Sequence, residues 1–597
     1  MRAIGKFILW LFAILGLLST ALVAAVVLFS LSVRDKIPEL AEGSILALDW
    51  NRQIPEHRAT EPVFPDRDQA TLLETVQAIG RAADRPEITG LTVTLGRTPF
   101  GFAEAQELAD AIRRFRQSGK PAYVFAEDLA TMGDATSTMM LVSAFDQVWL
   151  QPSGSVGLTG ISLEIPFAAD ALEEIGIEAE FEQRHEFKGG ADPFIRNRMP
   201  IALRRSLQGA ADGLLEQVVS SIAADRDLTP DAVRALVDNG PHLAREALAA
   251  DLIDRTGYES DFWNFVDQEF SDPQRISAPF LLAATEPEET AARIAVLYGV
   301  GPIGLPDDGV GPFSDRGFDP DSVVATLDAI ADGSIEAGAV LFRVVSPGGA
   351  YGPSDTVWNA VGRVRDAGIP VVVSMGDIAA SGGYFVSANA DRIFARPGTL
   401  TGSIGVYGGM FDASELWRSL GVRWEQVTAG ANAGMWSFNR GFDQRERARF
   451  ANAIDFVYED FTTKVAEGRG LDATQLDAAA RGRIWLGSAA QSVGLVDELG
   501  GFEEAFSAIR GILELEPDSA LDLVVLPEPL SPFDILVETA GRGDFQILAG
   551  AVLADGIEER LRERTRTLLG SSVLLTAPAG LLSAPTIEVQ GRPYGYH

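Results

Sequence analysis

The sequence predicts an α/β protein built from two similar halves, each a parallel sheet covered by helices, behind one amino-terminal membrane helix. Three observations predict this fold: an uncharged apolar run near the amino terminus, an internal repeat, and alternating strand-like and helix-like segments within each copy of the repeat. A chain of 597 residues is also too long for a single core.

The first element is the apolar run at 7–33, which has 27 residues without a charge. About 20 residues suffice to cross a bilayer as a helix, so we expect a membrane anchor at 1–36. A cleaved signal peptide is the alternative, but its apolar region is normally ~7 to 15 residues and no clear A-x-A site follows this one. Arg2 and Lys6 favour an amino terminus inside the cell. The body would then face a bacterial periplasm.

The next elements are two copies of one sequence pattern. Three pairs of segments match along the chain: ILALDW at 45–50 with IAVLYG at 294–299, LLETVQAI at 72–79 with VVATLDAI at 323–330, and SGKPAYVF at 118–125 with AGIPVVVS at 367–374. We therefore expect a first repeat at 37–270 and a second at 293–530. The stretch at 271–292, which contains TEPEETA, is interpreted as a linker.

Within each copy, short β-rich runs such as AVLFRVV and PVVVSM alternate with helical patterns such as DTVWNAVGRVRDAG. This alternation predicts βαβ units and a parallel sheet. The last part, 531–597, is expected to be an extension. Its segment at 547–572 has the pattern of an amphipathic helix, and the apolar stretch that follows is too short to span a membrane.

Composition excludes several classes of function. The net charge of −35 and the pI near 4.5 argue against nucleic acid as a partner. The absence of cysteine excludes disulfides, thiolate metal sites and cysteine nucleophiles. With four histidines in the chain, a histidine-rich metal site is disfavoured.

A candidate nucleophile lies in the second copy, where the strand VVVSM leads to GDIAASGGYF. Ser381 follows this strand and precedes a helical pattern, so its hydroxyl is expected at a strand-turn-helix junction. The N–H of Gly382 could point at a developing oxyanion, and the SPGG turn with Gly348 and Gly349 could supply a second donor. A packing role is the common explanation of one ASGG. The set SPGG, ASGGY and LTGSIG is more specific for acyl transfer.

The first copy lacks this framework but carries a lysine that the second copy lacks. TPFG stands in place of SPGG, and TSTMM, with Ser137, stands in place of ASGGY. The first-copy segment RHEFKGGADPF contains Lys188, whereas the corresponding VTAGANAGMWSF has no lysine. Because the losses are complementary, we predict one site that takes Ser381 from one half and Lys188 from the other.

A lysine can act as a general base if burial lowers its pKa from about 10.4. Ser-Lys hydrolases use this arrangement. A solvated loop lysine is the alternative interpretation of Lys188, and His185 is a rival base that lies between Arg184 and Glu186.

With these motifs the sequence resembles the long form of signal peptide peptidase A, a family of membrane-anchored Ser-Lys proteases with a ClpP/crotonase-like fold. The resemblance covers nearly all of the chain after the anchor. It implies that Ser381 is the nucleophile, that Lys188 is the general base, and that Gly382 with one N–H of the SPGG turn forms the oxyanion hole. It also implies that Ser403 in LTGSIG orients the lysine, although a turn serine is an equal alternative. Two departures are Gly189, where the family often has serine, and Asp377, where a small residue is common.

The resemblance further implies hydrolysis of signal-peptide remnants and other apolar peptides, an inner-membrane location with a periplasmic body, a homo-tetramer, and no metal or nucleotide cofactor. A catalytically inactive scaffold or chaperone is the alternative function, and an acyl-CoA-handling enzyme of the crotonase type ranks lower. The sequence leaves open whether serine and lysine meet within one chain or between chains.

Overall fold

The structure, a computed structural model, describes residues 40–58, 69–97, 99–129, 135–285, 289–304 and 318–527. In these ranges we find no helix that is both long and apolar enough to cross a membrane. The apolar run at 7–33 and the extension at 531–597 lie outside the described residues.

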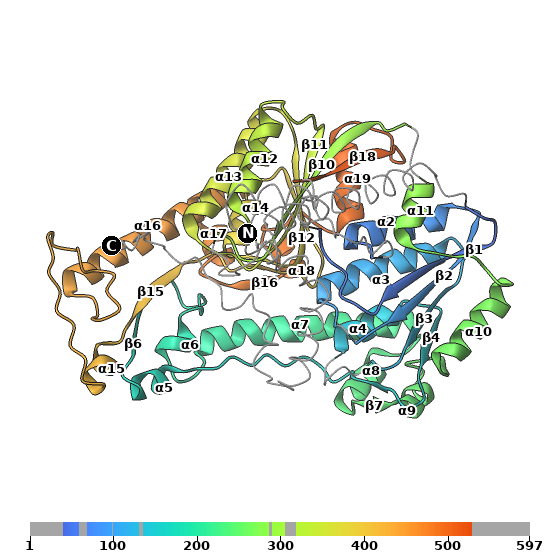
Figure 1. Ribbon diagram of the computed structural model, residues 1–597, viewed down its shortest axis with the longest axis horizontal. Coiled ribbons are helices and arrows are strands. Elements are labelled where there is room, and N and C mark those ends of the chain that lie inside the picture. Colours follow the sequence, from blue (N-terminus) through green and yellow to red (C-terminus); the bar gives the residue numbers. More distant parts are fainter. Residues whose placement is uncertain are drawn as a thin grey trace, which may run out of the picture.

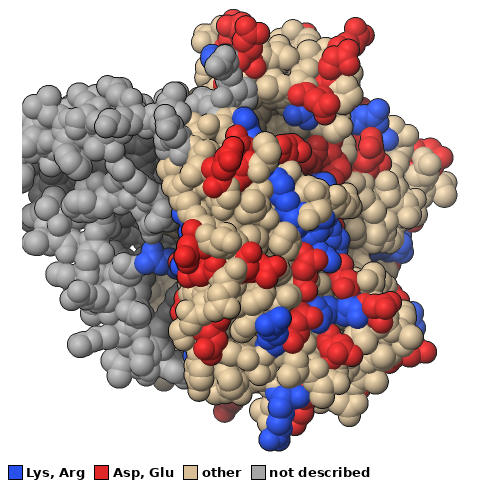
Figure 2. All heavy atoms as spheres, turned by 90° about the vertical axis from the view of Figure 1, so that its right-hand side faces the viewer, with Lys and Arg blue, Asp and Glu red and all other residues tan. Residues whose placement is uncertain are grey.

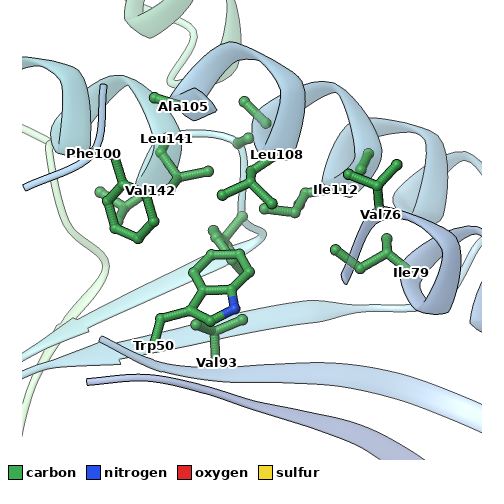
Figure 3. Close-up of a cluster of buried hydrophobic side chains, with 14 of the residues drawn as sticks. Trp50, Val76, Ile79, Val93, Phe100, Ala105, Leu108, Ile112, Leu141 and Val142 are labelled. Atoms are coloured by element: carbon green, nitrogen blue, oxygen red, sulfur yellow. The ribbon is translucent and has the colours of Figure 1, made fainter. Parts of the chain in front are cut away.

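The first half contains a parallel sheet with the strand order β8-β4-β3-β2-β1-β9. The strands are β1 (Ser44–Trp50), β2 (Ile88–Leu95), β3 (Ala122–Ala126), β4 (Gln147–Leu150), β8 (Arg255–Thr256) and β9 (Arg275–Ile276). The helices α2 (Leu72–Asp84), α3 (Phe102–Gln117) and α4 (Thr136–Val142) cover one face. Figure 3 shows their apolar side chains directed at Trp50 and Val93 of the strands. Helix α10 (Glu259–Phe270) covers the other face with aromatic residues.

The second half repeats this pattern. Its strands follow the order β16-β14-β12-β11-β10-β18. In addition, β13 pairs with β12, and β17 pairs with β13; all pairs are parallel except β14 with β16. The strands are β10 (Ala292–Val300), β11 (Ala339–Ser346), β12 (Val371–Ala380), β13 (Arg392–Ala395), β14 (Leu400–Gly402), β16 (Ile484–Leu486), β17 (Glu498–Leu499) and β18 (Leu521–Leu526). The helices between them include α12 (Pro320–Ala331), α13 (Tyr351–Asp366) and α14 (Gly382–Ser387). The predicted duplicated α/β architecture is confirmed.

The second sheet is buried on both faces, and this joins the two halves into one body. Along β10, Ala295 and Leu297 pack with α12 and α13, whereas Ile294 and Val296 pack with α2, α3 and α19 (Phe502–Ile512). Strands buried on both faces are expected to be continuously apolar, which explains runs such as AVLFRVV and PVVVSM.

A long arm extends from this body (Figure 1). It contains an antiparallel pair of strands, one from each half: β6 (Glu178–Gln183) and β15 (Tyr407–Asp412). Figure 1 shows α7 (Ile201–Asp225) running back from the arm to the first half and α16 (Gln444–Arg469) linking the arm to the second. The shorter arm helices are α5 (Ala169–Glu174), α6 (Asp192–Ile195) and α15 (Ser414–Ser419). The strand pair brings the loop after β6 next to the second half.

The remaining elements pack around the two sheets. They are β5 (Ser155–Val156), α8 (Pro230–Asp238), β7 (His242–Leu243), α9 (Ala244–Ala249), α17 (Ala473–Ala479) and α18 (Gly487–Ser492). The face seen in Figure 2 carries acidic and basic side chains interspersed with one another, so charge on that face is mixed rather than segregated.

The segment at 271–292, expected as a linker, is partly folded onto the first half. Its β9 pairs with β1, and it contains the helix α11 (Ala278–Ala284). Leu281 of α11 is fully buried, and the Arg81 guanidinium donates to the carbonyl oxygens of Leu282 and Thr285 at 3.0 Å. The apolar sequence APFLLAA, rather than the TEPEETA that follows it, accounts for this packing.

Candidate active site

Ser381 occupies the turn between β12 and α14, and its backbone is strained. Its φ of 55° and ψ of −117° are rarely adopted by a residue other than glycine. The N–H of Ser381 donates to Gly402 O at 2.8 Å, which ties the turn to β14. The residue is 1% exposed. The turn therefore holds the hydroxyl in a fixed direction, beside the first N–H groups of α14.

Lys188, from the loop after β6, meets this hydroxyl within the same chain. Its Nζ lies 2.9 Å from Ser381 Oγ, 2.8 Å from Ser403 O and 3.0 Å from Ser403 Oγ. A neutral amine has two N–H donors and one lone pair. Two donors toward Ser403 would leave the lone pair to accept the proton of Ser381.

Burial gives this amine the protonation behaviour of a base at neutral pH. Lys188 is 3% exposed, and desolvation lowers the pKa of its ammonium from 10.5 to about 7. A large fraction of Lys188 is therefore uncharged at pH 7.

Two glycines allow neighbouring segments to approach Lys188 closely. Gly482 has a φ of +81°, and a Cβ there would lie 2.5 to 2.6 Å from the N, Cα and Cβ atoms of Lys188. A Cβ on Gly405 would lie 3.1 Å from Lys188 Cδ.

The Arg481 guanidinium also pairs with Glu186, in the loop that carries Lys188, at 2.9 Å. Sequence reasoning did not select Gly482 or Arg481. They lie in the sequence RGR, and this short pattern does not indicate that the segment contacts the lysine loop.

The three predicted oxyanion glycines surround Ser381, but their N–H groups differ. Gly348 has a φ of +104°, and its N–H donates to Ser346 Oγ at 3.2 Å. Among the described residues, the N–H groups of Gly349 and Gly382 have no acceptor. A Cβ on Gly382 would lie 3.0 Å from Gly349 N, so these two donors lie close together. Gly349, rather than Gly348, is therefore the candidate for the second donor.

The rival groups lie elsewhere. The His185 ring packs against Tyr458 with ring centroids 4.6 Å apart, and burial lowers its pKa. In the first half, Ser137 of α4 donates from Oγ to Phe100 O at 2.6 Å. Its hydroxyl is thus engaged with the backbone of its own half.

Neither departure from the family pattern adds a group at Ser381. A Cβ on Gly189 would lie 2.6 Å from Leu203 Cδ2, so packing on α7 favours glycine at this position. Asp377 contacts α3 of the first half, where its Oδ1 accepts the N–H of Ala103 at 2.7 Å.

A model of peptidase family S49 matches this chain at residues 114–270 and 363–515, which together make up just over half of it. The chain belongs to peptidase family S49. Membership, the duplicated architecture and the relatives below make it a serine protease of the long, duplicated form.

Three curated relatives match most of the chain. Protease 4 of Salmonella typhi is 29% identical over 75% of this chain and 72% of its own length. Protease 4 of Haemophilus influenzae is 28% identical, over 75% of this chain and 74% of its own. The chloroplastic serine protease SPPA of Arabidopsis thaliana is 22% identical over 90% of this chain and 80% of its own length.

One solved structure that matches is a mutant of ClpP1 from Listeria monocytogenes, at 17% identity and a TM-score of 0.24 over 36% of this chain and 94% of that one. A likeness of this size carries no argument about function.

Proposed function

We propose that this S49 peptidase is a membrane-anchored endopeptidase that uses a Ser381–Lys188 dyad to degrade cleaved signal peptides and other apolar peptides. The observation that carries the proposal is the 2.9 Å separation of Lys188 Nζ and Ser381 Oγ, contributed by different halves. We also propose that each of the two halves that contribute to the site has a ClpP/crotonase-like fold.

In the proposed reaction, uncharged Lys188 accepts the proton of Ser381 while Ser381 Oγ attacks the peptide carbonyl carbon. Ser403 accepts the two N–H bonds of the lysine and so directs its lone pair at the serine. The resulting ammonium gives its proton to the leaving amine. Water, deprotonated by the same lysine, then attacks the acyl carbon and releases Ser381.

The oxyanion that forms on the carbonyl is stabilised by the N–H groups of Gly349 and Gly382. Removal of one such donor costs an acyl-transfer enzyme about 10²- to 10³-fold in kcat. Gly348 would contribute by allowing the turn to approach, because a Cβ there would lie 2.6 Å from Gly382 N.

The proposed substrates and location follow from the family resemblance. A single span at 7–33 would tether the body at the periplasmic face of a bacterial inner membrane, where signal-peptide remnants are left after secretion. We also propose a homo-tetramer. Exposed apolar side chains on the arm support assembly with further copies, among them Trp424 (58% exposed), Val427 (101%) and Phe438 (47%).

Fluorophosphonate labelling and hydrolysis of an apolar peptide ester test the dyad. We expect Ser381→Ala to abolish both, and Lys188→Ala to abolish hydrolysis with an unchanged fold by circular dichroism. Ser492→Ala, which alters an exposed hydroxyl on α18, is the matched control and should behave as the wild type. Full hydrolysis by either site variant would refute the dyad, and an unlabelled, inactive wild type would favour the scaffold alternative.

A further inference from the structure

β12 does not run straight into the nucleophile turn. In its first part, Met375 lies opposite both Val344 of β11 and Ala395 of β13. Beyond the register shift, Ala379 lies opposite Ser346 and pairs with β14 instead of β13. Between these two pairings β11 contributes one residue, Val345, whereas β12 contributes the three residues 376–378. Such a bulge bends a strand and changes the direction of the residues that follow it, and here Ser381 follows three residues later.

The carboxylate of Asp377, in the middle of this bulge, reaches into the first half. Its Oδ1 accepts the N–H of Ala103 at 2.7 Å and that of Glu104 at 3.3 Å, in the first turn of α3. These N–H groups have no partner within the helix, and a carboxylate there is favourable. A Cβ on Gly101 would lie 1.8 Å from Asp377 Oδ2, so the carboxylate can occupy this position only because residue 101 is glycine.

The neighbouring residue fits the same contact. A Cβ on Gly376 would lie 2.7 Å from Val345 Cγ2 and 3.2 Å from Glu56 Oε1 of the first half. Glu56 pairs in turn with the fully buried Arg343 of β11, at 3.0 Å. The bulge is therefore held between β11 and the first half, with little room to shift.

We propose that Asp377 is a positioning residue: by binding the amino-terminal turn of α3, it holds the β12 bulge against the first half and so fixes the Ser381 turn opposite Lys188. This inference rests on the proposed function. The carboxylate acts through the backbone of β12, because its hydrogen bonds go to the first turn of α3. The sequence marked Asp377 only as a departure from the family pattern, and its contacts with α3 give it a role.

A double-mutant cycle between Gly101 and Asp377 tests the inference. Hydrolysis of an apolar peptide ester gives kcat and KM, and fluorophosphonate gives the labelling rate of Ser381. We expect Asp377→Gly to lower kcat and the labelling rate by about 10- to 100-fold with KM changed less than about 3-fold, because a small misplacement of a reacting group has this effect. Asp377→Asn, which keeps one acceptor oxygen, should retain more activity than Asp377→Gly.

Gly101→Ala should lower kcat by a similar factor, because its methyl group displaces the carboxylate. In the double variant Gly101→Ala/Asp377→Gly, the methyl group has no carboxylate to displace, so kcat should equal that of Asp377→Gly. Gly209→Ala is the matched control: a Cβ there has nothing within 4 Å, and its kcat should be that of the wild type.

The inference is overturned if Asp377→Gly keeps the wild-type kcat, or if the losses from Gly101→Ala and Asp377→Gly multiply in the double variant. Thermal unfolding is measured on every variant. If Asp377→Gly does not fold, Gly101→Ala decides: a lower kcat at the wild-type Tm supports the inference, and a wild-type kcat overturns it. A Ser381→Ala enzyme that still hydrolyses the ester would refute the proposed function itself, whereas an inactive Ser381→Ala beside fully active Asp377 variants refutes the positioning role alone.

Discussion

The rate of acylation should follow the deprotonation of Lys188. Since burial lowers the pKa of this lysine to about 7, half of it is uncharged near pH 7. The labelling rate of Ser381 should then reach a plateau above about pH 8 and fall to about one tenth of it at pH 6 and one hundredth at pH 5. An exposed lysine, with a pKa near 10.4, would instead give a rate that still rises tenfold per pH unit at pH 9.

The assay is the second-order rate constant of fluorophosphonate labelling, measured from pH 5 to pH 9 at constant ionic strength. Lys188→Arg is the control, because a guanidinium stays protonated over this range and should abolish the pH-dependent labelling. A wild-type profile without an inflection between pH 6 and pH 8 would show that an uncharged Lys188 does not govern the reaction.

Four further outcomes are expected. Since folding lowers the pKa of Lys188, the folded state holds fewer protons than the unfolded chain between pH 7 and 10.5, and stability should rise with pH across this window. At pH 7, Lys188→Met should raise the free energy of unfolding in urea by about 1 to 3 kcal/mol, and this gain should disappear toward pH 10. Gly482→Ala should lower kcat more than about 10-fold, measured on a peptide ester, because its methyl group would displace the Lys188 backbone; unchanged kcat would contradict the packing. Glu107→Ala should lower the free energy of unfolding by about 3 to 5 kcal/mol, because it removes a buried partner 3.1 Å from the Arg343 guanidinium; a loss below about 1 kcal/mol would argue against this ion pair. Val427→Asp should reduce assembly in light scattering with little change in Tm if the arm joins copies of the chain, and an unaltered oligomer would exclude this position from the interface.

The fold was predictable where it depends on repeated patterns. The α/β alternation and the matched segments of the two halves come from local periodicity, which the sequence contains in full. The segment at 271–292 was harder, because β9 has two residues and α11 has seven, and elements this short carry no clear period. They fold because β9 pairs with β1 at the edge of the sheet and α11 packs against α2.

The site was predictable where the two halves differ. The complementary losses selected Ser381 and Lys188 as partners, and the structure brings these side chains together within one chain. The choice between Gly348 and Gly349 was not predictable, because it depends on a hydrogen bond from Gly348 to Ser346. The contact of Gly482 with the lysine loop depends on the approach of segments far apart in the sequence, and no local pattern specifies it.

Lys188 and Ser381 stand 193 positions apart in the chain, and this separation has a consequence for biosynthesis. A ribosome releases the lysine-bearing half long before the serine-bearing half has emerged, so the nascent polypeptide has an amine without a hydroxyl to activate. If the two groups form the proposed dyad, hydrolysis requires the pairing of β15 with β6, which joins the two copies. With that dyad, the order of translation would keep the enzyme inert until its second copy has been made.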